Sequence, residues 1–147
     1  MIEYKVKVYS SGGKEWYLNG KLHREDGPAI EFVNGDKCWF LNGKRHREDG
    51  PAVEWADGSK LWFLNGDWHR EDGPAVECST GTKEWYLNGK LHREDGPAIE
   101  WADGDKYWYI NGKEYTEQEY LAKTSSPKEL TMAEIEKFLG YSVKVIK

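Results

Sequence analysis

The sequence predicts a mainly β fold: an antiparallel sheet of repeated hairpins with a small α-helical cap at its C-terminal end. Histidine recurs every 23 residues, and Asn-Gly or Asp-Gly turn signals recur at the same interval. The final 32 residues lose this interval and contain helix-capping motifs. We therefore expect a leading half-repeat strand over 1–13, a hairpin repeat array over 14–115, and a helical cap with a terminal strand over 116–147.

Length and composition limit the class of protein. A chain of 147 residues is sufficient for one domain, and its 8 Trp and 9 Tyr supply most of the apolar surface for a core. The net charge of −5 argues against a long nucleic acid as partner. The sequence has no apolar run of ~20 residues and no signal-peptide pattern, which predicts a cytoplasmic protein with no membrane association. Cys38 and Cys78 are too few for a disulfide framework.

The 23-residue repeat organises most of the chain. A Trp-aromatic-aliphatic-Asn-Gly string opens five times, and a His-Arg-Glu-Asp-Gly-Pro-Ala string (HREDGPA) occurs four times. Tyr115 takes the place of a fifth histidine, so the array ends there. Tyr9 and Gly12 are in phase with Phe32 and Gly35, which indicates the leading half-repeat. The repeated tryptophans form a predicted structural ladder: Trp16, Trp39, Trp62, Trp85 and Trp108.

Each unit is predicted to contain two short strands, near residues 29–33 and 37–41. Asn34-Gly35 and Asn42-Gly43 are expected to form two-residue hairpin turns. HREDGPA is expected to be a loop, because Asp-Gly-Pro reverses the chain and Pro cannot donate a ladder hydrogen bond.

A two-residue turn at Asn34-Gly35 places Ile30 opposite Trp39 and Glu31 opposite Cys38. The predicted core face then carries Ile30, Phe32, Trp39 and Leu41, with Val53, Trp55, Trp62, Leu64, Val76, Cys78, Trp85, Leu87, Ile99, Trp101, Trp108 and Ile110. The predicted wetter face carries Glu31, Glu54, Glu77 and Glu100 beside Tyr17, Phe40, Phe63, Tyr86 and Tyr109. A tail of some thirty residues cannot cover so long an apolar face, so we expect a homo-oligomer or a bound partner.

The tail is predicted to be helical. Thr116 and Thr131 each begin a capping box, and Gly140 is placed to end the second helix. Residues 141–146 alternate like residues 4–8, which predicts a strand that pairs with the N-terminal strand or covers a sheet edge.

The repeat resembles MORN repeats in its 23-residue period and its aromatic-x-Asn-Gly-Lys-x-His string, over roughly residues 5–115. This resemblance implies β-hairpins stacked into a long, curved single sheet. Arg24-Glu25-Asp26 follows His23 where MORN units have His-Gly-x-Gly, so the resemblance does not carry lipid binding with it. HREDGPA itself is similar to repeats of phages and large DNA viruses. That similarity implies a phage protein acting in the host bacterial cell, where some small phage proteins sequester nucleotide immune signals.

The repeated histidines and carboxylates raise the question of catalysis or metal binding. Four near-identical copies with no singular nucleophile predict that the chain is not an enzyme, and we expect neither a cofactor nor a metal site. The favoured interpretation of HREDGPA is structural. Histidine donates to a neighbouring carbonyl or carboxylate, Asp closes the Asp-Gly turn, and Arg pairs with acidic side chains of the next unit.

Sequestration of a small nucleotide-like ligand is the leading functional hypothesis. An exposed Trp68 would stack on a base, while neighbouring histidines and arginines would meet polar groups of the ligand. The predicted binding residues are Trp68, His46, Arg47, His69, Arg70, His92 and Arg93. Two alternatives remain open: a module that docks a host protein through its repeat face, and a nucleotide-degrading enzyme.

Overall fold

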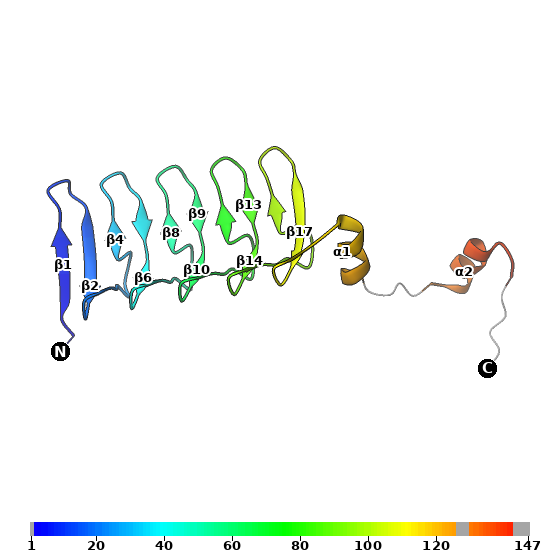
Figure 1. The fold of residues 1–147 in the computed structure, drawn as a ribbon, viewed down its shortest axis with the longest axis horizontal. Helices are drawn as coiled ribbons and strands as arrows, with labels where there is room; N and C mark the ends of the chain where they lie inside the picture. The colour runs from blue at the N-terminus through cyan, green and yellow to red at the C-terminus, as the bar shows by residue number, and fades with distance from the viewer. Residues whose placement is uncertain (1, 126–129, 143–147) are drawn as a thin grey trace.

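The computed structural model describes residues 2–125 and 130–142, and it confirms the predicted fold class. The chain forms a row of hairpins that runs from the N-terminus to a short helix (Figure 1). Twelve strands join one antiparallel sheet, in the order β1-β2-β4-β5-β8-β9-β12-β13-β16-β17-β18, with β3 paired to β2. The strands are β1 Tyr4–Val8, β2 Lys14–Leu18, β3 Lys21–Leu22, β4 Ile30–Glu31, β5 Lys37–Cys38, β6 Phe40–Leu41, β7 Lys44–Arg45, β8 Val53–Glu54, β9 Lys60–Leu61, β10 Phe63–Leu64, β11 Asp67–Trp68, β12 Val76–Glu77, β13 Lys83–Glu84, β14 Tyr86–Leu87, β15 Lys90–Leu91, β16 Ile99–Glu100, β17 Lys106–Ile110 and β18 Lys113–Tyr115.

Each repeat contains two hairpins, which we call upper and lower by their position in Figure 1. The predicted second strand is broken at Trp39 into β5 and β6, so the interior units have four short strands where two were predicted. The lower hairpins turn at Asn-Gly. In the hairpin of β6 and β7, Asn42 has φ +52° and Gly43 has φ +80°, which are the left-handed angles of a two-residue type I′ turn. This part of the turn prediction is confirmed.

The upper turn differs from the prediction by one residue. The Phe32 N–H donates to the Asp36 carbonyl over 2.9 Å, and the Gly35 N–H donates to the Phe32 carbonyl over 3.0 Å. With Gly35 at φ +96°, this is a three-residue loop, a type I turn followed by a glycine bulge. Ile30 therefore faces Cys38 and Glu31 faces Lys37. The predicted register across Asn34-Gly35 is wrong.

The shifted register changes which side chains share a face, because a slip of one residue moves a whole strand to the other side. Cys38 and Phe40 join Ile30 on what we call the core face, while Trp39 and Leu41 leave it. Phe63, expected on the wetter face, is therefore buried. The core cluster consists of Cys38, Ala52, Val53 and Phe63, with Ile30, Phe40, Leu61 and Trp68 packed against it. Trp39 also contacts this cluster, although its ring lies beneath Arg47.

The opposite face, which we call the charged face, carries an alternating ladder of lysine and glutamate. Each lysine lies directly opposite a glutamate on the neighbouring strand. Such a pair of opposite charges stabilises a sheet by roughly 0.2–1 kcal/mol. The sequence predicted Glu31 opposite Cys38, but in this ladder Glu31 lies opposite Lys37. The ladder runs Lys14, Glu31, Lys37, Glu54, Lys60, Glu77, Lys83, Glu100 and Lys106.

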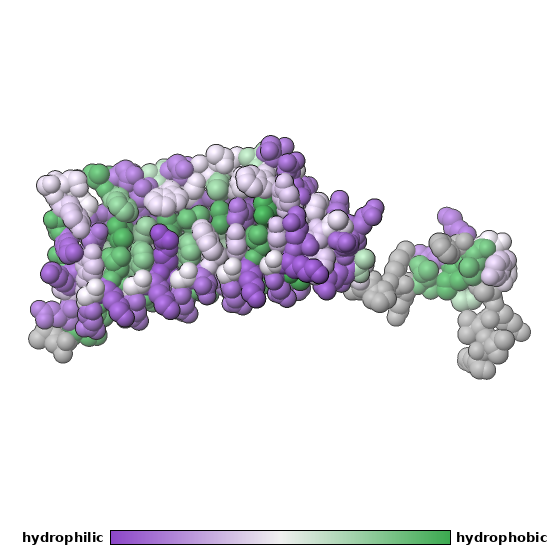
Figure 2. All heavy atoms as spheres, in the orientation of Figure 1, coloured by the Kyte–Doolittle hydropathy of each residue, from purple (hydrophilic) through white to green (hydrophobic). Residues whose placement is uncertain are grey.

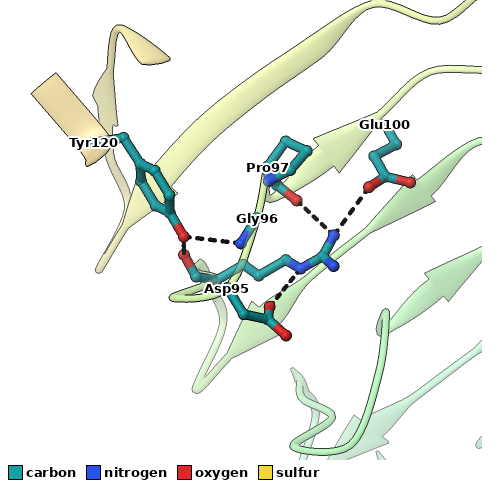
Figure 3. Close-up of polar contacts among 6 residues, drawn as sticks. Asp95, Gly96, Pro97, Glu100 and Tyr120 are labelled. Atoms are coloured by element: carbon teal, nitrogen blue, oxygen red, sulfur yellow. Dashed lines mark hydrogen bonds and ion pairs between the residues drawn. The ribbon is translucent and has the colours of Figure 1, made fainter. Parts of the chain in front are cut away.

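The C-terminal segment contains two helices, α1 (Glu117–Thr124) and α2 (Met132–Leu139). The Thr116 and Thr131 capping boxes form as predicted, and Gly140 ends α2 with φ +75°. Tyr120 of α1 is buried and covers the last repeat (Figure 3). The predicted strand 141–146 lies outside the described residues beyond Ser142, so its pairing with β1 is untested. In the described ranges, neither helix has the length and hydrophobicity required to traverse a bilayer.

Candidate functional site

The arginine of each HREDGPA loop is the centre of a repeated polar cluster. Arg70 donates from Nε to Asp72 over 2.8 Å and from Nη1 to the Pro74 carbonyl over 3.1 Å. Nη1 also donates to Glu77 of the charged face over 2.7 Å. Arg24, Arg47 and Arg93 repeat this pattern, and Figure 3 shows the copy that involves Asp95, Pro97 and Glu100. The guanidinium thus ties its loop to the sheet.

Each of these guanidiniums also lies over a ladder tryptophan. The Arg70 Cζ is 4.0 Å from the ring centroid of Trp62, and the other three arginines contact their tryptophans at 3.9–4.1 Å. A Cβ placed on Gly73 would lie 2.9 Å from the same Cζ. Glycine follows Asp in every copy because the guanidinium occupies the space of a side chain. The first four tryptophans of the ladder are therefore half-buried beneath arginine, whereas the sequence predicted the ladder in the apolar core.

The histidines link consecutive repeats. The backbone N–H of Asn65 donates to Nδ1 of His46 over 3.0 Å, and His23, His69 and His92 accept in the same way from the repeat that follows each of them. The prediction that histidine donates is wrong at this nitrogen, because Nδ1 is an acceptor. In a neutral ring the proton is then on Nε2, which lies 3.5–3.6 Å from the glutamate two residues along the chain. These rings hold the lower turns in position.

The loops have an acidic surface. The Arg47 side chain beside Asp49 lowers the pKa of that carboxyl below its ordinary value, and the other three HREDGPA aspartates show the same shift for the same reason. On the face drawn in Figure 2, hydrophilic residues gather along the lower margin of the array. Glu48 and its counterparts project into solvent, with side chains 75–85 % exposed.

Two grooves lie between successive HREDGPA loops and contain most of the predicted binding residues. One, of about 750 Å³, is lined by Arg70, His92 and Arg93 above Trp85 and Leu87. The other, of about 770 Å³, is lined by Arg47, His69 and Arg70 above Trp62 and Leu64. Each groove has four carboxylates and two guanidiniums in its lining, so neither presents a net positive charge to an anion.

The structure places Trp68 and His46 outside both groove linings. Trp68 is half-buried on the core face, with its ring centroid 4.1 Å from that of Phe63 and 5.7 Å from that of Tyr86. Arg45 occupies the equivalent place one repeat earlier and lies over Phe40 and Phe63. The expectation of an exposed Trp68 beside Arg70 is therefore wrong: the indole packs between repeats.

Phe32, Trp55 and Trp101 were predicted as core residues, but with Tyr9 they form an exposed aromatic row on the core face. Its members are 38–50 % exposed and lie at the upper turns. A signal was present in the sequence, since these aromatics share the phase of Tyr9 and directly precede the turn residues. We define the aromatic row as Tyr9, Phe32, Trp55 and Trp101, with Cys78 in the fourth of its five places.

Side chains of the upper turns fix the spacing of this row. Asp36 Oδ1 accepts the backbone N–H of Ala56 over 2.6 Å. In the next two repeats the hydroxyls of Ser59 and Thr82 accept the corresponding N–H groups of Ser79 and Ala102 over 2.9 and 3.2 Å. The four upper turns at residues 32–36, 55–59, 78–82 and 101–105 are consequently joined to one another by hydrogen bonds across the sheet.

Within residues 2–125 and 130–142, no three His, Cys, Asp or Glu side chains are grouped so as to hold a metal ion. No protein-family model and no curated protein matches the chain.

Proposed function

We propose that this chain is a non-catalytic, phage-type hairpin-repeat scaffold of MORN-like construction that docks a host protein through its repeat array. The observation that carries the proposal is the aromatic row, because exposed apolar side chains that gather on one face are typical of protein interaction sites. Trp55 and Trp101 supply the residue type most often found at binding hot spots. The HREDGPA side chains support a structural role, since their principal groups are engaged within the chain.

Sequestration of a nucleotide-like ligand is the second candidate, and it rests on the two grooves. Their size suits a small ligand, and one of them is lined by Arg70, His92 and Arg93 together with Trp85, whose ring lies beneath Arg93. The surplus of carboxylates over guanidiniums opposes the binding of a phosphate, and this is why we rank docking of a protein first.

Affinity purification from bacterial cytoplasm separates the two candidates. We would compare the tagged wild-type chain with a row variant, W55S/W101S, and a groove variant, E71Q/E94Q, which removes two exposed groove charges. Docking predicts a stoichiometric protein that rebinds in purified form to the wild-type chain and to the groove variant, and that is lost from the row variant. Sequestration predicts a small molecule, detected by mass spectrometry after denaturation, with more of it on the groove variant. If neither accompanies the wild-type chain, both candidates fail.

A further inference from the structure

The aromatic row has a spacing that selects one kind of partner backbone. Successive members lie two hydrogen-bonded strands apart, which corresponds to ~9.6 Å. A polyproline II helix completes one turn of three residues in ~9.3 Å, so every third residue would meet the next member of the row. Over the four steps from Tyr9 to Trp101 the two repeats differ by only about 1 Å.

Other backbone conformations fit this spacing less well. An extended β-strand returns to the same face every second residue, after ~6.7 Å, and cannot keep step with the row. An α-helix returns after seven residues, or ~10.5 Å, and drifts from the row by about 4 Å over four steps. A proline-rich segment already adopts the polyproline II conformation before it binds, so it loses little conformational entropy on binding. This favours its recognition by exposed aromatic side chains.

Charge and shape at the upper turns add a second requirement. The five upper turns, residues 9–13, 32–36, 55–59, 78–82 and 101–105, contain four aspartates and no lysine or arginine. Between the first two members of the row lies a mainly apolar hollow of about 610 Å³, whose apolar lining is Tyr9, Ile30, Phe32 and Val33. One lysine and two glutamates also border it: Lys14, Glu15 and Glu31. A proline ring suits such a hollow, and a lysine beside it suits the aspartates.

The spacing is also rigid enough to act as a template. The Asp36, Ser59 and Thr82 side chains bond each of their turns to the next, so the aromatic row is organised before a partner arrives. From the spacing, the hollow and the aspartates, we infer that the aromatic row binds a basic, proline-rich segment in the polyproline II conformation, with prolines in step at every third residue. This inference rests on the proposed function, for which it names the partner class.

Fluorescence anisotropy with defined peptides tests the inference on the full chain. The probe is a labelled peptide of five Pro-Pro-Lys triplets, and the comparison peptide has five Gly-Gly-Lys triplets, which keep the charge and lose the polyproline II conformation. We expect the proline peptide to bind at least tenfold more tightly than the glycine peptide. A two-triplet proline peptide, which spans fewer members of the row, should bind about tenfold more weakly than the five-triplet peptide. Equal binding of the proline and glycine peptides would show attraction of charge alone and overturn the inference.

Variants locate the site. W55S is expected to weaken binding of the five-triplet peptide about fivefold, while Y141S, which removes an exposed tyrosine outside the array, leaves it unchanged. C78W fills the gap between Trp55 and Trp101 and should tighten binding about fivefold. Unchanged far-ultraviolet circular dichroism confirms that each variant is folded. A W55S variant that binds the peptide like the wild-type chain refutes the site.

Two further outcomes separate this inference from the proposed function. If the proline peptide fails to bind while the row variant W55S/W101S still loses a co-purified protein, the polyproline II inference fails and the docking function stands. If W55S/W101S instead converts a dimer to a monomer in analytical ultracentrifugation, the row is covered by a second copy of the chain, and the inference is wrong.

Discussion

The contact between arginine and glycine in the HREDGPA loops predicts that G73A destabilises the protein when Arg70 is present and stabilises it when Arg70 is replaced by alanine. A Cβ on Gly73 would lie 2.9 Å from Arg70 Cζ, whereas carbon atoms in favourable contact are ~3.5–4.0 Å apart. In G73A the guanidinium must therefore move by roughly 0.6–1 Å, which strains its bonds to Asp72 and Glu77 and its contact with Trp62. We expect G73A to lower the free energy of unfolding by about 2 kcal/mol.

In the R70A variant, the guanidinium that an added Cβ on Gly73 would meet is absent. Gly73 does not have a left-handed φ, so alanine fits its backbone and reduces the entropy of the unfolded chain. There, G73A should raise the free energy of unfolding by about 0.5 kcal/mol, which gives a coupling energy of about 2.5 kcal/mol between the two positions.

Urea unfolding followed by tryptophan fluorescence measures all four members of this cycle. The control is Gly66 at a lower turn, where φ is +88° and the nearest side-chain atom to an added Cβ is 3.7 Å away. G66A should cost about 1 kcal/mol whether or not Arg70 is present, because its strain is in its own backbone. Equal costs of G73A in both backgrounds would refute the proposed contact.

Three further predictions follow from burial and hydrogen bonding. Val53 is fully buried and Val33 is 73 % exposed, so V53A should cost about 2 kcal/mol in urea unfolding while V33A costs close to nothing. Burial, with Glu84 nearby, raises the pKa of Tyr86 to about 12. Because an unfolded tyrosine ionises near pH 10, the stabilisation by neutral Tyr86 is complete below about pH 10 and is lost as the pH rises towards 12. Y86F should therefore lose less stability than the wild-type chain over that range, and equal alkaline melting curves would contradict this. Tyr120 OH donates to the Arg93 carbonyl and accepts the Gly96 N–H, each over 2.9 Å, so Y120F should cost about 1–2 kcal/mol and increase amide hydrogen exchange at Gly96.

The sequence predicted the elements whose signals are local. The 23-residue period indicated the stacking of like hairpins, and Asn42-Gly43 specified a type I′ turn because both of its residues tolerate a left-handed φ. The capping boxes at Thr116 and Thr131 were likewise predicted, since each motif satisfies hydrogen bonds within its own helical turn.

The candidate site was predicted less well, because its contacts join residues that the register brings together. Asn34-Gly35 and Asn42-Gly43 share the same dipeptide, yet the first belongs to a three-residue loop and the second to a two-residue loop. This one-residue difference places Trp39 on the charged face beneath Arg47. Phe32 precedes the turn and keeps its predicted face, but it is exposed at the end of that face. Trp68 was expected in solvent, but the ring of Tyr86 in the following repeat covers it.

The sequence by itself determined that the chain repeats, where it turns and where its helices begin, because those properties depend on residues close together in the chain. The tertiary structure alone decided which side chains share a face, and so converted a predicted core ladder into arginine-covered tryptophans and a separate exposed aromatic row. The physical reason is the two-residue period of a β-strand, by which a single extra turn residue reverses the direction of the side chains in the strand that follows the turn.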